Sequence, residues 1–391
     1  MVQMKTVSLY IHWPFCLAKC PYCDFNSHVA VDIDRLAWQQ AYLDELEAYV
    51  RLVEKMLDSP AKSIQLKTIF FGGGTPSLMP PEIIAAIIDK ASSYFAPVSD
   101  IEITAEANPT SAETAKLKDF SVAGVNRLSV GVQSLDTQGL AFLGREHSAK
   151  QAIKTLETAR KYFSRISADL IYGLPHQDFS NWHRQLALIT DICCDHLSCY
   201  QLTIEPGTPF NTRAQKGAIL TQNPDQVADF YLQTEKFLSE RAMPAYEISN
   251  YARNGQESRH NLNYWQMGNW LGLGPGAHGR WHVHTQRYST INRRSPKGWL
   301  ETVQQKGIGT DQAGFENTQA CFEEYWMMGL RLCKGVEWPG PVATQYPEHK
   351  LNPHWLDIFI EQNWLELKQD RLLPTLEGRL RLDMMLRHLL D

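Results

Sequence analysis

The chain has 391 residues, of which 43% are hydrophobic and 21% are charged, and its formal net charge is −5. This composition is typical of a globular protein with one large domain or two. It excludes a strongly basic nucleic-acid-binding protein. No apolar run is close to the length of about 20 residues that a membrane-spanning helix needs. We therefore expect no nucleic-acid partner and no integral membrane segment. Because no export signal precedes Tyr10, we also expect a cytoplasmic location.

A strand predicted at residues 7–12 leads into a short loop that contains three cysteines: Cys16, Cys20 and Cys23. Thiolates are soft ligands, so this C-x3-C-x2-C spacing indicates an iron–sulfur cluster or a zinc site. A structural zinc site needs four protein ligands, and the candidates for a fourth ligand near this loop are His12 and His28. An iron–sulfur cube held by three thiolates leaves one iron open for chemistry. The other five cysteines are expected to be free thiols: Cys193, Cys194, Cys199, Cys321 and Cys333.

Strands and helices alternate regularly along the first 202 residues. The predicted strands are 7–12, 68–71, 101–105, 127–130, 166–171 and 196–202. The predicted helices are 34–57, 81–91, 111–120, 149–163 and 180–192. This alternation indicates an α/β fold with a parallel sheet, and no two further strand–helix units follow Leu202. We therefore predict a partial (β/α)6, TIM-like barrel that is curved but not closed.

Polar or glycine-rich residues follow each predicted strand. Gly72–Gly74 follow the second strand, Glu106 the third and Gln133 the fourth. In a β/α barrel the carboxyl ends of the strands form the active-site face, so these residues are expected to share one rim. Asp169 lies inside an otherwise apolar strand, where an unpaired carboxylate would be costly. It is therefore expected to face the barrel mouth and to bind a ligand.

A second distinctive stretch, residues 260–265, has the sequence His-Asn-Leu-Asn-Tyr-Trp and precedes the glycine-rich run 272–278. Tyr and Trp often pack in a core with one satisfied polar tip, so a structural interpretation stays open. A histidine beside aromatic rings also suits a flat macrocycle, because imidazole can bind an axial iron.

The cysteine spacing, with an aromatic residue directly before the third cysteine, resembles the radical S-adenosylmethionine enzymes. In that family three thiolates hold a 4Fe–4S cluster whose open iron binds S-adenosylmethionine. An electron donor reduces this cluster. The resemblance implies that eight residues surround S-adenosylmethionine: Tyr10, Tyr22, Gly74, Thr75, Glu106, Gln133, Arg145 and Asp169.

The order of motifs C-x3-C-x2-C, GGGTP, GVQS, YGLP, HNxxYW and GxGxGAH is similar to that of the oxygen-independent coproporphyrinogen III oxidase family. Phe25 stands where the oxidases have a fourth cysteine, and only nine residues precede Tyr10, so the chain resembles the haem-chaperone branch. That resemblance implies that four residues lie near haem: His260, Asn261, Tyr264 and Trp265. It also implies transfer of haem to an acceptor apoprotein.

Two alternatives remain open at the level of sequence. One is radical-dependent oxidative decarboxylation of coproporphyrinogen III, and the other is a zinc-stabilised barrel without a redox role. Three segments are expected: a radical S-adenosylmethionine core at 1–240, an extension with the HNxxYW stretch at 241–308, and a small winged-helix-like α+β domain at 309–391. That domain lacks a basic face.

Overall fold

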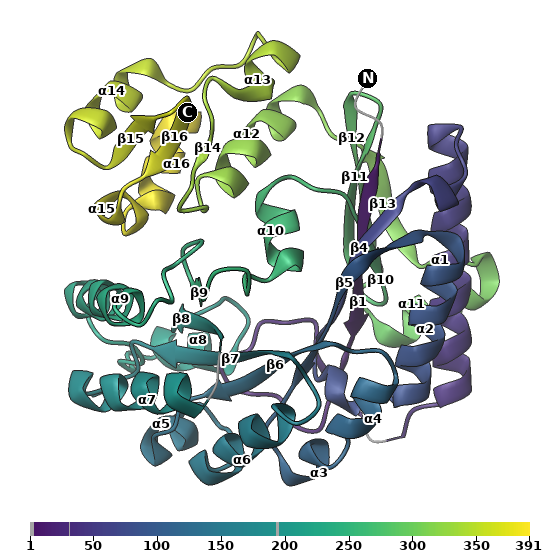
Figure 1. The fold of residues 1–391 in the computed structure, drawn as a ribbon, viewed down its shortest axis with the longest axis horizontal. Helices are drawn as coiled ribbons and strands as arrows, with labels where there is room; N and C mark the ends of the chain where they lie inside the picture. Colours follow the sequence, from purple (N-terminus) through teal and green to yellow (C-terminus); the bar gives the residue numbers. More distant parts are fainter. Residues whose placement is uncertain (1–3, 31, 193–194) are drawn as a thin grey trace.

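The computed structural model describes residues 4–30, 32–192 and 195–391, so Cys193 and Cys194 lie outside the described residues. Within these ranges a large sheet has the strand order β13-β12-β11-β10-β1-β4-β5-β6-β7-β8-β9 (Figure 1). A smaller sheet with the order β14-β16-β15 belongs to the C-terminal part of the chain. The prediction of an α/β fold is confirmed.

The centre of the large sheet consists of the six parallel strands that the sequence predicts. They are β1 (Thr6–Trp13), β4 (Gln65–Gly73), β5 (Ala96–Ala107), β6 (Arg127–Gln133), β7 (Arg165–Tyr172) and β8 (His196–Gln201). Helices that cover the outer face of this curved sheet in Figure 1 are α1 (Arg35–Leu57), α2 (Pro81–Tyr94), α3 (Ser111–Thr114), α4 (Leu117–Val122), α5 (Thr137–Phe142), α6 (Ala149–Ala159) and α7 (Phe179–Ile192). β1 and β8 do not pair with each other, so the barrel is open, as expected.

Local sequence explains where these helices begin. Asp34 accepts a hydrogen bond from Ala37 N and caps α1, and Ser148 with Gln151 forms a capping box at the start of α6. Such caps satisfy backbone N–H groups that have no partner inside the helix. The apolar side of each helix packs on the sheet, and the largest buried cluster of the described residues joins both.

Both edges of the barrel sheet are extended by later segments of the chain. β10 (Trp270–Leu273) pairs parallel to β1, and β11 (His278–Val283), β12 (Gln286–Asn292) and β13 (Thr310–Phe315) continue antiparallel from it. At the other edge, β9 (Asn250–Ala252) pairs antiparallel to β8. The sequence interpretation found none of these strands, because they are short and interrupted by glycine and polar residues.

A buried carboxylate fastens α1 to this extension. Glu45 accepts hydrogen bonds from Gly274 N at 2.7 Å, Gly309 N at 2.9 Å and Trp299 Nε1 at 2.9 Å. Burial raises the pKa of Glu45 to about 7. The extension is therefore held to the core by specific polar contacts as well as by the sheet.

The C-terminal part forms a second apolar cluster, which groups side chains from Cys321 to Leu389. Its elements are α12 (Thr318–Gly329), β14 (Val336–Glu337), α13 (Gly340–Gln345), α14 (Pro353–Glu361), β15 (Leu365–Lys368), β16 (Arg371–Pro374), α15 (Leu376–Arg379) and α16 (Leu382–Leu390). In Figure 1 this small α+β unit lies over the open side of the barrel. Throughout the described ranges, no helix is both long enough and apolar enough to cross a bilayer.

Candidate functional site

A cavity of about 460 Å³ opens at the carboxyl ends of the barrel strands, next to the cysteine loop. Residues from the cysteine loop and from the ends of β4 to β8 line this cavity, which is named the cluster cavity below. Its predicted site residues are Cys16, Cys20, Tyr22, Cys23, Gly74, Thr75, Glu106, Gln133, Arg145 and Asp169. The polar strand ends thus share one rim, as a β/α barrel requires.

The cysteine loop is held in a defined shape by its own backbone. β2 (Phe15–Cys16) pairs parallel to β3 (His28–Val29), and His28 N donates to Pro14 O at 2.7 Å. Lys19 Nζ donates to Phe25 O and to Ser27 O, each at 3.4 Å. These contacts fix the loop before any ligand binds.

Each of the three thiols has a polar neighbour. Thr75 Oγ1 donates to Cys16 Sγ at 3.3 Å, and Arg145 Nη1 donates to Cys20 Sγ at 3.4 Å. Cys23 Sγ lies 3.9 Å from Ser27 Oγ. Hydrogen bonds to sulfur stabilise thiolate and tune the potential of a cluster bound to it. Burial raises the pKa of Cys16 and of Cys23, so their thiolate forms depend on such donors or on a bound metal.

Asn108 connects two of these sulfur contacts, and the site prediction did not include it. Its Nδ2 donates to Thr75 Oγ1 at 3.1 Å, and its Oδ1 accepts from Arg145 Nη2. A chain of hydrogen bonds therefore runs from the Cys16 sulfur through Thr75, Asn108 and Arg145 to the Cys20 sulfur. Asn108 lies directly after β5, and this position was the signal in the sequence that could have identified it.

The histidines near the loop do not complete a zinc site. His12 is buried, with Nδ1 2.9 Å from the Tyr10 hydroxyl and Nε2 2.9 Å from Asn26 O. His28 is exposed, and its Nε2 lies 3.2 Å from Asn26 Oδ1. Among the described residues, no three His, Cys, Asp or Glu side chains group closely enough to hold one metal ion. A cube-shaped cluster binds each thiolate through a different iron, so this donor set of three thiols fits a 4Fe–4S cluster.

The glycine-rich turn after β4 packs directly on the cysteine loop. Gly74 N donates to Trp13 O at 2.7 Å, and Thr75 N donates to Phe15 O at 2.9 Å. A Cβ atom at Gly74 would lie 2.8 Å from Phe15 O, and Gly73 has a φ of +117°. Glycine is therefore needed at these positions for close approach and for the left-handed backbone.

Two carboxylates face the cavity beneath the thiols. Burial and the neighbouring Asp169 raise the pKa of Glu106 to about 8, and burial raises the pKa of Asp169. Glu106 accepts from Gly73 N at 3.3 Å, and Ser129 Oγ donates to Asp169 at 3.1 Å. A cationic ligand such as a sulfonium or ammonium group would favour the ionised carboxylates.

Gln133 and Arg145 complete the opposite wall of the cavity. Gln133, at the end of β6, has a φ of +63°, which is uncommon for a residue other than glycine and is found often at functional sites. Arg145 Nη2 donates to Gly131 O at 3.1 Å. The cavity thus offers cationic and anionic partners for a zwitterionic ligand, and these residues fit S-adenosylmethionine.

Tyr10 is the one predicted S-adenosylmethionine residue that does not line this cavity. Its hydroxyl contacts His12, and its ring stacks on Phe70 with centroids 6.3 Å apart.

The HNxxYW stretch forms α10 (Arg259–Trp265), which lies between the barrel sheet and the C-terminal unit (Figure 1). None of His260, Asn261, Tyr264 and Trp265 lines the cluster cavity. His260 is 1% exposed, with Nδ1 2.6 Å from Thr68 Oγ1 and Nε2 2.7 Å from the Tyr264 hydroxyl. Both ring nitrogens are therefore engaged within the protein, and burial lowers the pKa of His260 to about 3. The role of these four residues in haem binding stays a prediction.

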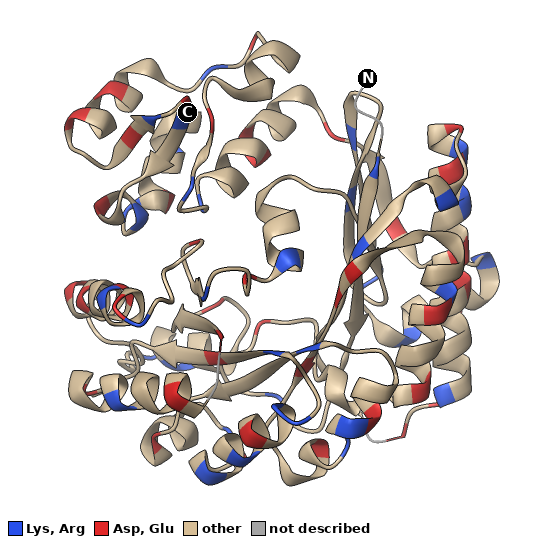
Figure 2. Ribbon diagram, viewed as in Figure 1, with Lys and Arg blue, Asp and Glu red and all other residues tan. Residues whose placement is uncertain are grey.

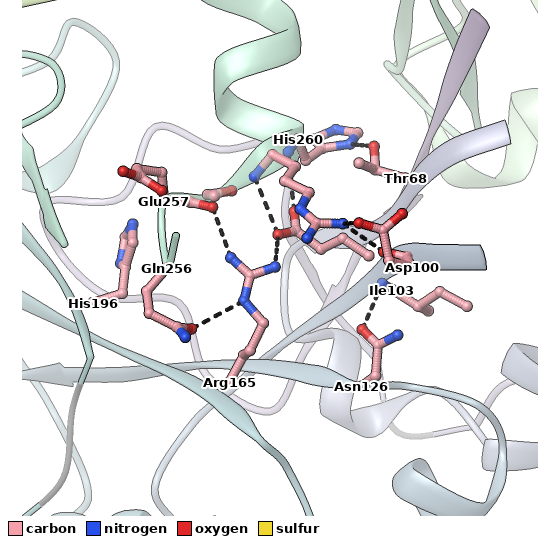
Figure 3. A network of polar contacts seen from close by, with 12 residues as sticks. Thr68, Asp100, Ile103, Asn126, Arg165, His196, Gln256, Glu257 and His260 are labelled. Atoms are coloured by element: carbon pink, nitrogen blue, oxygen red, sulfur yellow. Dashed lines mark hydrogen bonds and ion pairs between the residues drawn. The ribbon is translucent and has the colours of Figure 1, made fainter. Parts of the chain in front are cut away.

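A polar network anchors α10 inside the barrel (Figure 3). Glu102 on β5 accepts from His260 N at 3.0 Å, from Arg259 N at 3.1 Å and from Arg165 Nη1 at 2.5 Å. Arg165 also donates to Glu257 O at 2.7 Å. The buried carboxylate is thus paired and hydrogen-bonded, which is the arrangement that makes a buried charge tolerable.

Comparison with known proteins identifies the family. The Radical SAM superfamily matches residues 10–188. The chain is 35% identical to the heme chaperone HemW of Escherichia coli (strain K12) over 99% of this chain and 98% of that protein. It is 40% identical to the mitochondrial radical S-adenosyl methionine domain-containing protein 1 of Bos taurus, over 85% of this chain and 74% of that protein.

A solved structure supports the same fold. Coproporphyrinogen III oxidase (HemN) from Escherichia coli superposes with a TM-score of 0.77 at 20% identity, over 99% of this chain and 90% of that chain. At 20% sequence identity, the similarity to HemN shows only a shared fold. The 35% identity to HemW over nearly the full length of both chains shows the family. The chain therefore belongs to the radical S-adenosylmethionine superfamily and, within it, to the HemW family.

Proposed function

We propose that this protein is a haem chaperone that binds a 4Fe–4S cluster and S-adenosylmethionine and transfers haem to an acceptor apoprotein. The observation that carries the proposal is the alignment with the heme chaperone HemW along nearly the whole of both chains. The cluster cavity supports it, because three thiols and a set of charged and polar groups surround one space.

Within this proposal, Cys16, Cys20 and Cys23 hold the cluster, which supplies one-electron chemistry when it is bound. Arg145 and Thr75 keep the two sulfurs that they contact in place, and Glu106 with Asp169 faces the cationic part of S-adenosylmethionine. An electron donor and an acceptor apoprotein are the partners that this function needs. A cytoplasmic location is also proposed.

Phe25 is the feature that favours the chaperone over the oxidase. The residue at this position is 58% exposed and lines the cluster cavity, and it brings no fourth thiol to the loop. We expect an anaerobic assay with reductant, S-adenosylmethionine and coproporphyrinogen III to give no vinyl product. Vinyl product formed at the rate of a parallel coproporphyrinogen oxidase reaction would contradict the chaperone function.

Haem uptake tests the proposal directly. The cluster-loaded protein is titrated with haem under nitrogen, and an apo-cytochrome is then added as acceptor. We expect uptake of about one haem per chain and its passage to the acceptor. A protein that takes up no haem would overturn the proposal.

The His260→Ala variant tests the proposed part of the HNxxYW stretch. We expect weaker haem uptake by the folded variant, measured at a temperature where circular dichroism shows it intact. Tyr288→Phe, which alters a ring outside this stretch, serves as the control. Equal uptake by His260→Ala and wild type would remove His260 from the haem site.

A further inference from the structure

A second cavity, of about 800 Å³, lies beside the cluster cavity. One wall comes from β8 and from α9 (Pro224–Ser239), and the other comes from α15, α16 and Arg331, which follows α12. Tyr200, Gln201 and Thr203 line both cavities, so the two spaces adjoin. Ligand sites of proteins commonly have volumes of about 300–1,000 Å³ and lie between domains.

Among the described residues, four arginines line the second cavity, and Asp383 is the one acidic residue of its lining. The arginines are Arg331, Arg379, Arg381 and Arg387. Figure 2 shows basic segments on the side of the C-terminal unit that faces α9 and β9. Its remaining lining is largely aromatic and aliphatic, with Tyr172, Tyr231 and Leu382 among the residues. The cavity therefore combines apolar surface with positive charge.

Two of the arginines have their charge matched by a close carboxylate. Arg379 Nη2 donates to Glu235 at 3.1 Å, and Arg381 Nη1 donates to Glu377 at 2.7 Å. These two cations therefore have little charge left for a ligand.

The other two arginines are less closely matched by carboxylates. Arg331 Nη2 forms a long ion pair, at 4.0 Å, with the buried Glu247, and its Nε is buried without a hydrogen-bond partner among the described residues. The exposed Arg387 forms no side-chain hydrogen bond or ion pair in the described part of the chain, and no ion pair joins it to Asp383. Among the described residues, the cavity thus presents one cation without a carboxylate partner, Arg387, and a second, Arg331, whose ion pair is long.

Two residues that line this cavity also have buried polar atoms without a hydrogen-bond partner among the described residues. Tyr231 is 6% exposed, and its buried hydroxyl has no partner among the described residues. Gln222 Oε1 is also buried without a partner. Buried polar atoms are nearly always hydrogen-bonded, so these two atoms have hydrogen-bonding capacity that no described residue uses.

We propose that the second cavity is the haem site, with the two propionates of haem at Arg331 and Arg387 and its flat apolar ring between α9 and α16. The inference rests on the proposed function and assigns the propionate contacts, not the iron ligand. Arginine suits this role because its planar guanidinium binds carboxylates in a fixed geometry. The HNxxYW stretch reaches this wall through Trp265, whose ring lies 4.7 Å from the Arg331 guanidinium carbon. Haem bound here lies next to the cluster cavity.

The test measures binding of iron protoporphyrin IX, and of its dimethyl ester, to the cluster-loaded full-length protein by absorbance titration. We expect Arg387→Ala to weaken binding of the free acid about ten-fold or more, since charge-assisted hydrogen bonds are lost, and to leave binding of the ester unchanged. Arg184→Ala removes an exposed arginine from α7, outside this cavity, and is expected to bind like wild type.

A second variant tests the site without changing charge. Ala228 lines the cavity from α9, and Ala228→Trp places an indole in it. We expect this variant to lose binding of both the acid and the ester while its unfolding temperature is retained. If both Arg387→Ala and Ala228→Trp bind haem as tightly as the wild type does, this site is overturned and the proposed function still stands. A wild type that binds no haem would overturn the proposed function itself.

Discussion

The raised pKa of Glu106 predicts how binding of S-adenosylmethionine depends on pH. With a pKa of about 8, about one Glu106 in ten is ionised at pH 7 and about one in a hundred at pH 6. The sulfonium ligand favours the ionised carboxylate, so its affinity for the cluster-loaded protein should rise about ten-fold per pH unit below pH 8 and level off above it. Anaerobic calorimetric titrations at pH 6, 7 and 8 measure this directly.

Glu106→Gln removes the titrating group. We expect its affinity to match wild type at pH 6, where Glu106 is protonated, and to fall below wild type at pH 8. A shallow pH dependence should remain, because burial also raises the pKa of Asp169. Glu157→Gln, at an exposed position of α6, serves as the control. Identical pH profiles for wild type and Glu106→Gln would refute the reasoning.

The same pKa also has a consequence for stability. Between the unfolded pKa near 4.3 and the folded value of about 8, the folded state binds the Glu106 proton more tightly than the unfolded state. The contribution of Glu106 to the free energy of unfolding is therefore lost as pH rises through this window. S-adenosylmethionine should restore stability most at the high end of the window.

Three further predictions follow from the contacts around the site. Gly74→Ala should lower iron bound per chain, because its Cβ would meet Phe15 O at 2.8 Å; iron analysis after reconstitution checks this, and full iron content would contradict it. Arg145→Lys should make the cluster potential more negative through loss of the donor to sulfur, as spectroelectrochemistry would show, and an unchanged potential would count against that contact. Tyr264→Phe should lower the free energy of unfolding by about 1–3 kcal/mol in urea titrations, because His260 Nε2 loses its buried partner; a loss near zero would show that this contact is dispensable.

The core of the fold was predictable because its pattern is local. Each of the six parallel strands contains apolar or β-branched residues and ends near polar or glycine residues, and the intervening helices have apolar stripes. The cysteine spacing and the rim residues such as Glu106 and Asp169 could likewise be read from single segments. Their convergence on one cavity follows from the rule that carboxyl ends of parallel strands meet at one edge.

The remaining features depend on contacts between distant segments. β10 pairs with β1 across more than 250 residues, and no local pattern specifies that partner. Asn108 gains its role only from the simultaneous positions of Thr75 and Arg145. The burial of His260 against Thr68 could not be predicted either, because the sequence around this histidine fits both a buried structural residue and a haem ligand. The second cavity arises where the C-terminal helices meet α9, so its arginines form no motif in the sequence.

The three thiolates are the most direct point at which to test the account. The wild type and a variant with Cys16, Cys20 and Cys23 all replaced by alanine are reconstituted anaerobically with iron and sulfide. We expect about four irons and four sulfides per wild-type chain, with a visible band that bleaches on dithionite addition, and neither iron nor sulfide in the variant. Iron and sulfide retained in the triple variant, or stoichiometric zinc in the wild type, would contradict the account.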